Sequence, residues 1–256
     1  MSIFDTHAHL DDSAFAGDFN KVLERARAAG VALILNVGFD LESSAAAVGL
    51  AGKYREIYAA VGIHPHEAAG AGPDYLAELE RLAAHHKAVA IGEIGLDYYR
   101  DLSPRRVQKK VFLEQLELAK KLGKPVIIHD RDAHGDVMDI LRRAAPGLAG
   151  GVMHCYSGSW EMARESISLG FYISLAGPVT YPNAVRLKDL AARLPEEYLL
   201  VETDAPYLAP QAFRGKRNEP AFIVHTVGEI ARLRKKDPEY IAKITAENGR
   251  RLFRID

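Results

Sequence analysis

Three polar side chains stand at alternate positions in the opening stretch MSIFDTHAHL, namely Asp5, His7 and His9. The apolar run around them predicts a strand, in which side chains two positions apart share one face and lie about 6.6 Å apart along the strand. Two imidazoles on one face can bind one metal ion through nitrogen atoms at roughly 2.0–2.1 Å. We therefore expect His7 and His9 to share a divalent metal ion. Asp5, one step deeper, is expected to hold one of these histidines in a single tautomer.

Other metal-competent side chains lie near the ends of further short apolar runs. These are His64 in IYAAVGIH (57–64), Glu93 in AVAIGEIG (88–95), His129 in PVIIHD (125–130), His154 in GGVMHCYS (150–157) and Asp204 in YLLVETD (198–204). The opposite ends of these runs carry ordinary residues. A single buried histidine is more often a hydrogen-bonded core residue than a ligand. Six runs that agree on residue type and on the same end, however, predict a metal site.

The elements that must position these residues form a regular alternation. The other three apolar runs cover residues 2–9, 31–39 and 171–177, and helical patterns separate the runs. One helix is expected over 18–30, ending at Gly30. Another is expected over 103–123, with Ser103 as N-cap, Pro104 as first helical residue and Gly123 just past the end. Two more helical patterns follow the eighth run.

Eight strand–helix units in 256 residues predict an α/β fold, a (β/α)8 TIM barrel, with residues 1–256 as a single domain. The carboxyl ends of the strands carry the active site in such barrels, which is the end where the metal-competent residues fall. An open doubly wound sheet is the alternative. It usually has fewer strands, and the glycine-rich phosphate loop expected after its first strand is replaced here by HAHLDD.

Composition limits the classes of function. The 33 lysines and arginines nearly balance 34 acidic residues, giving a net charge of −1, so any contact with nucleic acid must be local. One cysteine excludes an internal disulfide and a cysteine zinc cluster. The longest apolar stretches, such as VALIL, are far shorter than the roughly 18 residues of a membrane span, and no signal peptide is evident. We therefore expect a cytoplasmic enzyme that needs neither a membrane nor an obligate protein partner.

Seven segments, in order along nearly the whole chain, resemble the TatD family of metal-dependent hydrolases and deoxyribonucleases. They are FDTHAHLD, GIHPH, GEIGLDYYR, IIHDRDA, HCYSGS, ETDAPYLAP and RGKRNEP. The resemblance implies a barrel of the amidohydrolase superfamily type with two divalent metal ions. It assigns ligands to both ions: His7, His9 and Asp204 to the first, His129 and His154 to the second, and Glu93 to both as a bridge.

Such a centre is suited to phosphodiester hydrolysis. Four neutral imidazoles and two carboxylates leave the two ions with a net positive charge, which favours an anionic substrate, and two ions can acidify a shared water. Asp204 could accept the proton of that water. These ligands suit Zn²⁺, Mg²⁺ or Mn²⁺ without selecting one. We expect a 3′-exonuclease acting on DNA ends, or on another phosphodiester.

Two other classes of function stay open. One is an amidohydrolase or esterase acting on a small molecule; against it, many relatives that cleave amides bridge their metals with a carboxylated lysine, and no lysine lies at the end of the fourth or fifth run. The other is a barrel that binds metal as an interaction module, which the intact set of six ligands disfavours.

Two histidines and an aspartate near the ligands have less defined roles. His64 is expected to orient a phosphate or donate a proton, with a structural role as the alternative. Asp97, four residues after Glu93, either lines the cleft or caps a loop. Nothing in the sequence gives His66 a role.

Basic residues near two strand ends are candidates for contact with the substrate. Arg131 follows the run that carries His129, and the resemblance implies a contact with a substrate phosphate, against a solvated charge as the alternative. Arg214, Arg217 and Asn218 lie in the loop after the eighth run, and loops at this place in barrels often bind phosphate. A plain surface loop is the alternative for these three residues.

Overall fold

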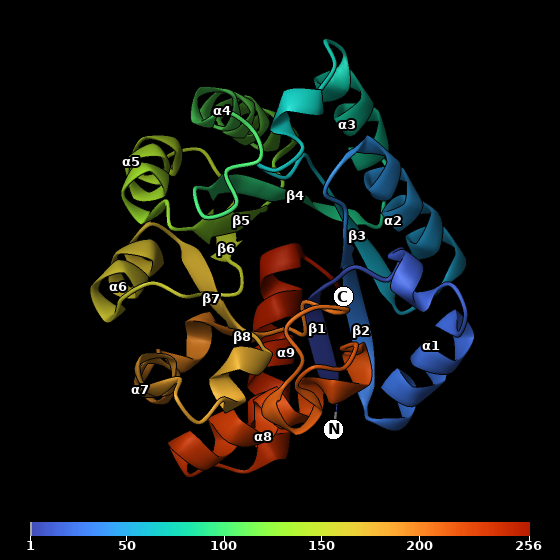
Figure 1. The fold of residues 1–256 in the computed structure, drawn as a ribbon, viewed down its shortest axis with the longest axis vertical. Coiled ribbons are helices and arrows are strands. Elements are labelled where there is room, and N and C mark those ends of the chain that lie inside the picture. The colour runs from blue at the N-terminus through green and yellow to red at the C-terminus, as the bar shows by residue number, and fades with distance from the viewer. Residues whose placement is uncertain (1) are drawn as a thin grey trace. The chain divides into compact units, whose positions relative to one another are not determined.

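A computed structural model describes residues 2–256 (Figure 1). All eight predicted strands are present, and their order in the sheet follows their order along the chain. They are β1 (Ile3–Ala8), β2 (Val31–Val37), β3 (Ile57–Val61), β4 (Ala88–Asp97), β5 (Val126–Arg131), β6 (Gly151–Met153), β7 (Phe171–Leu175) and β8 (Leu199–Val201). Eight parallel strands alternating with helices in this order are a (β/α)8 barrel, so the predicted fold class is confirmed.

The α-helices of the described residues follow the strands. They are α1 (Phe19–Ala28), α2 (Leu41–Lys53), α3 (Tyr75–Ala83), α4 (Arg105–Leu122), α5 (His134–Ala144), α6 (Trp160–Ser168), α7 (Val185–Arg193), α8 (Ile223–Arg234) and α9 (Pro238–Phe253). Within residues 2–256, no helix combines the length and the apolar character that a membrane crossing requires.

The start of α4 differs from its prediction. Pro104 is the N-cap, and Ser103 does not cap the helix. The Ser103 hydroxyl instead donates to the carbonyl of His66 at 2.8 Å and accepts the N–H of Ala69 at 3.0 Å, because a preceding loop offers these partners. Gly123 ends the helix in the left-handed conformation at φ 62°, as predicted.

The fold divides into two compact units. The first unit comprises residues 2–36, 155–160 and 173–256, and the second comprises residues 37–154 and 161–172. The first unit holds β1, β8 and most of β2 and β7, and the second holds β3 to β6. The expectation of a single domain stays a prediction.

In the first unit, the carboxyl end of β1 lies beside the segment that follows β8. Ala8 forms a parallel bridge with Ala205. The N–H of His9 donates to the carbonyl of Ala205 at 2.7 Å, and the N–H of Asp204 donates to the carbonyl of His7 at 2.9 Å. Backbone pairing between the first and last strands therefore makes His7, His9 and Asp204 neighbours.

Helix α9 packs against β1 (Figure 1). The rings of Phe4 and Phe253 meet edge to face, with centroids 6.0 Å apart, and both side chains are buried. A side chain at Gly249 would come within 2.6 Å of the Phe4 ring, so glycine at this helix position permits the close approach. β1 thus rests on a tightly packed surface, which limits movement of its histidines.

In the second unit, β4 and β5 lie in parallel register, with Gly95 opposite His129 and Asp97 opposite Arg131. Gly95 has φ +148°, and a side chain there would overlap the carbonyl oxygen of His129. Only glycine satisfies both conditions. The two strands can therefore approach closely where Gly95 lies opposite His129, two residues after Glu93.

Candidate metal centre

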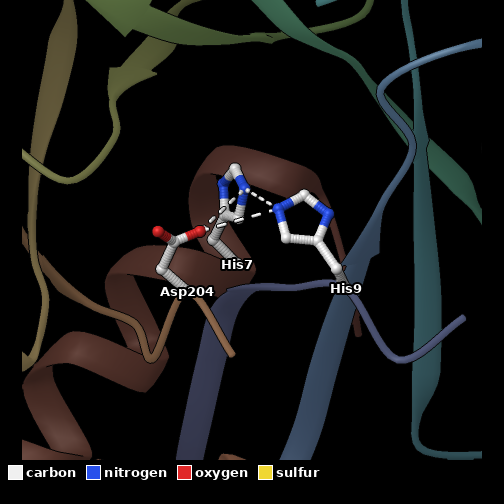
Figure 2. Close-up of side chains that lie close together, drawn as sticks. All are labelled: His7, His9 and Asp204. Atoms are coloured by element: carbon white, nitrogen blue, oxygen red, sulfur yellow. Dashed lines mark hydrogen bonds and ion pairs between the residues drawn. The ribbon is translucent and has the colours of Figure 1, made fainter. Parts of the chain in front are cut away.

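His7, His9 and Asp204 form a triangle of ligand atoms in the first unit (Figure 2). The two Nε2 atoms lie 3.3 Å apart, and Asp204 Oδ1 lies 3.8 Å from His7 Nε2 and 3.6 Å from His9 Nε2. A point equidistant from these three atoms is about 2.1 Å from each, which is the length of a zinc–nitrogen bond. Two imidazoles and one carboxylate, all largely buried, are therefore spaced to hold one divalent cation.

Asp204 owes its place to a tight turn after β8. Its φ of 56° is left-handed, a conformation that aspartate and asparagine adopt more readily than most residues. Its carbonyl accepts the N–H of Tyr207 at 2.8 Å. Asn218 Nδ2 donates to the carbonyls of Thr203 at 2.8 Å and Tyr207 at 2.7 Å, on either side of the turn. The Asn218 side chain is fully buried, so these contacts assign it to holding the turn, which differs from the substrate contact expected from the sequence.

Asp5, on β1, forms hydrogen bonds to the same turn. Its Oδ1 accepts the N–H of Thr203 at 2.9 Å and that of His7 at 3.4 Å, and its Oδ2 accepts the Thr203 hydroxyl at 2.6 Å. These bonds join β1 to the residue before Asp204 rather than holding an imidazole tautomer, which was the expected role. Burial of the fully enclosed carboxyl raises the pKa of Asp5 to about 7.

Replacing Asp5 by asparagine is expected to remove a pH-dependent loss of stability. A carboxyl whose pKa rises from 3.8 to about 7 on folding contributes stability that is fully present below pH 3.8 and is lost as the pH rises from there through about 7. Asparagine keeps an acceptor for the N–H groups and does not ionise. Between pH 4.5 and 8, the free energy of unfolding of the wild type should fall by about 2–3 kcal/mol relative to D5N.

Urea denaturation of both proteins at several pH values, with a chelator present throughout, measures this difference. The chelator removes any effect of metal binding on the two curves. Parallel pH profiles for D5N and the wild type would show that the buried carboxyl does not titrate in this range.

In the second unit, Glu93 lies at the centre of three imidazoles. Its Oε1 is 2.6 Å from His129 Nδ1, 2.9 Å from His154 Nε2 and 3.6 Å from His64 Nε2. Burial alone would raise the pKa of Glu93, but the adjacent His154 and His64 and the hydrogen bond with His129 hold it well below its ordinary value. The buried group therefore offers a charged carboxylate surrounded by nitrogen donors, which fits a divalent cation.

Asp97 orients His129 from the side opposite Glu93. Its Oδ2 lies 3.2 Å from His129 Nε2 and 2.8 Å from His66 Nε2, while its Oδ1 accepts the N–H groups of Tyr99 and Arg100. Although burial opposes the charge, these bonds hold the pKa of Asp97 below its ordinary range. A carboxylate on the second nitrogen of a ligand histidine fixes its ring and tautomer. The sequence carried one signal for this contact. Asp97 stands four residues after Glu93, and side chains an even number of positions apart on a strand share a face.

His64 is held in one orientation by the backbone of its own loop. Its Nδ1 accepts the N–H of His66 at 3.1 Å, which leaves Nε2 directed towards Glu93. Burial, with the neighbouring His129, lowers the pKa of His64 well below 6.5, so the ring is neutral at pH 7. His64, Glu93 and His129 each present a ligand atom within 4.8 Å of the others. His64 therefore lies beside two of the expected ligands, with its Nε2 directed at Glu93.

Comparison with known proteins places the chain in a family. A family model described as "TatD related DNase" matches residues 4–254. The chain belongs to the TatD family. A TatD relative from Bacillus subtilis, the metal-dependent hydrolase YabD, is 47% identical over 99% of this chain and 100% of its own length.

Two further TatD relatives bear on fold and activity. The 3′-5′ ssDNA/RNA exonuclease TatD of Cronobacter sakazakii is 37% identical, covering 98% of this chain and 97% of the relative. The crystal structure of YJJV, a TatD homologue from Escherichia coli, aligns with a TM-score of 0.93 at 35% identity over 99% of this chain and 98% of that one. The protein is thus a metal-dependent hydrolase, and the two groups of donors are the candidates for its metal.

The basic residues expected at the substrate have different surroundings in this TatD protein. The Arg217 guanidinium donates to both carboxylate oxygens of Asp18, at 2.6 and 2.9 Å, so it ties the loop after β8 to the start of α1. Arg131 is exposed and stacks 4.3 Å above the ring of Tyr99, and Arg214 is exposed 4.7 Å above the ring of Tyr181. The contacts of Arg217 favour a structural role, whereas Arg131 and Arg214 present exposed charge.

Proposed function

We propose that the protein is a two-metal phosphodiesterase that removes nucleotides from the 3′ end of single-stranded DNA. The observation that carries this proposal is the His7–His9–Asp204 triangle, whose spacing fits one divalent cation. The name of the Cronobacter sakazakii relative, a 3′-5′ ssDNA/RNA exonuclease, supports the choice of nucleic acid over other phosphodiesters.

In this proposal each group of donors holds one of two divalent ions, Zn²⁺, Mg²⁺ or Mn²⁺. His7, His9 and Asp204 bind the first, His129 and His154 bind the second, and Glu93 is shared. The resemblance of the ligand-bearing segments to those of the TatD family supports this assignment. The ions would supply a water of lowered pKa and positive charge for the phosphate.

The protein's own side chains then move protons and orient the substrate. Asp204 accepts the proton of the attacking water through its carboxylate, as a general base. His64 carries its proton on Nε2, because Nδ1 accepts the N–H of His66, and this N–H can donate a hydrogen bond that orients a phosphate oxygen. Asp97 holds the His129 ring in the orientation that binding requires.

Of the four residues expected at the substrate, two are engaged elsewhere in the fold. Arg217 is neutralised by Asp18, and Asn218 is fully buried. Arg131 and Arg214 remain as candidates for contact with phosphates, consistent with a net charge of −1. This distribution of charge favours an enzyme that binds a few nucleotides at a strand end over one that binds along a duplex.

Cleavage of end-labelled single-stranded DNA tests the proposal. Protein stripped of metal with a chelator should be inactive, and addition of Mg²⁺, Mn²⁺ or Zn²⁺ should restore shortening by one nucleotide at a time from the 3′ end. A panel of acyl amides and esters, assayed in parallel, tests the amidohydrolase alternative. D204N, purified in the same way, controls for contaminating nucleases. The nuclease proposal is wrong if the wild type cleaves DNA no faster than D204N with every metal, and internal cutting would refute end-directed action.

A further inference from the structure

A half-exposed aromatic ring stands beside the first group of ligands. Tyr207 lies three residues after Asp204, and 52% of the residue is exposed. Its ring meets the ring of His9 edge to face, with centroids 5.9 Å apart and planes at 62°. This exposed aromatic ring lies next to a candidate metal ligand. It therefore offers an apolar contact surface to a substrate bound at the metal.

The Tyr207 ring is held at both ends. Its backbone N–H donates to the carbonyl of Asp204 at 2.8 Å, and its carbonyl accepts from Asn218 Nδ2 at 2.7 Å. At the far end its hydroxyl donates to Asp12 Oδ2 at 2.9 Å. Asp12 is itself fixed, because its other oxygen accepts the N–H of Ala14 at 2.7 Å. The ring therefore has little freedom left to lose when a ligand packs on it.

The chemistry of the ring suits an uncharged, flat ligand group. Burial of part of the side chain and the bond to Asp12 raise the pKa of Tyr207 to about 12, so the phenol is neutral at physiological pH. Nucleobases stack on neutral aromatic rings whatever their sequence, because each base has a π-face. A nucleobase is joined to its phosphate by a single sugar. A phosphate at the His7–His9–Asp204 triangle would therefore bring a base within reach of a ring adjacent to His9.

We propose that Tyr207 is the stacking platform for the base of a nucleotide adjoining the scissile phosphate. This inference rests on the proposed nuclease function and names the part of the substrate that the first group of ligands recognises besides the phosphate. It assigns to Tyr207 a role in substrate binding that does not depend on base identity. The competing interpretation is that the ring only packs against His9, in which case its loss would affect all substrates alike.

Three oligonucleotides distinguish these interpretations: a normal single strand and two strands with an abasic tetrahydrofuran residue, at the 3′-terminal or the penultimate position. The metal-loaded wild type should cleave one abasic strand about tenfold less efficiently than the normal strand, the scale of one base–aromatic stack. Y207A should cleave the normal strand about tenfold less efficiently than the wild type does. It should also cleave the normal strand and the abasic strand that the wild type disfavours with equal efficiency. Y207F keeps the ring and should retain the discrimination.

Tyr240 provides a matched control. It is also a partly exposed tyrosine, at 39%, whose hydroxyl is bound to a carboxylate, Glu196, at 2.6 Å, but it lies on α9. Y240A should behave as the wild type, and metal content should be equal in all variants. Equal losses by Y207A on all three strands would overturn the inference, as would a wild type indifferent to both abasic residues. A wild type that cleaves none of the strands would instead overturn the proposed function, and this inference with it.

Discussion

Replacing Asp204 by asparagine is expected to lower kcat for phosphodiester hydrolysis by about 10³–10⁴-fold. Asparagine keeps an oxygen between His7 Nε2 and His9 Nε2 but removes the negative charge and the proton acceptor. It also tolerates the left-handed backbone at φ 56°, which alanine would adopt only with strain. The turn after β8 should therefore persist, and the loss should report chemistry rather than unfolding.

Metal analysis and the pH dependence of kcat separate the two roles of Asp204. Loss of the ligand charge should weaken binding of one ion, whereas loss of the base should persist when enough metal is added to saturate the site. D189N is a matched control, because Asp189 is an exposed aspartate of the same unit, paired with Arg193 on α7. A saturated D204N that keeps more than about a tenth of the wild-type kcat would exclude Asp204 as the proton acceptor.

The strands and the grouping of the candidate ligand side chains could be predicted because both depend on local patterns. A strand shows its buried face by alternation, so the spacing of His7 and His9 is enough to place them on one face. The strand-end rule for parallel barrels also predicts the place of Asp204, which follows β8, whereas Glu93 lies within β4 because this strand continues to Asp97. These are properties of single elements and of the fold class, and they need no knowledge of which distant residue each side chain touches. Cytoplasmic location and independence from a protein partner stay predictions.

The sequence did not predict contacts between side chains that lie far apart along the chain. Arg217 looked like a phosphate ligand because its charge is visible in the sequence, but its partner Asp18 lies 199 residues away. Asn218 looked like a polar loop residue, yet the fold buries it between the two sides of the Asp204 turn. Asp97 was ambiguous because its contact with His66 forms only when β4 meets the loop after β3.

The second large effect is expected at Glu93, where glutamine should lower kcat by at least about 10³-fold and reduce the bound metal to one ion or fewer per chain. The Glu93 carboxylate is 4% exposed and faces His129, His154 and His64. A neutral amide cannot balance two cations. Its NH₂ group would also face imidazole nitrogens that now meet a charged acceptor, which leaves buried donors poorly paired.

Two comparisons make the Glu93 result specific. E117Q changes an exposed glutamate on α4 and should leave activity and metal content unchanged. D97N removes the carboxylate behind His129 without touching Glu93, and should cost about 10–100-fold, the scale of a residue that orients a ligand. The loss of activity and of bound metal should be largest for E93Q, smaller for D97N and absent for E117Q, because these residues lie progressively farther from the proposed ions. An E93Q protein that binds two ions as tightly as the wild type would show that Glu93 does not bridge them. Its three imidazole neighbours would then surround a carboxylate that serves only to balance their charge.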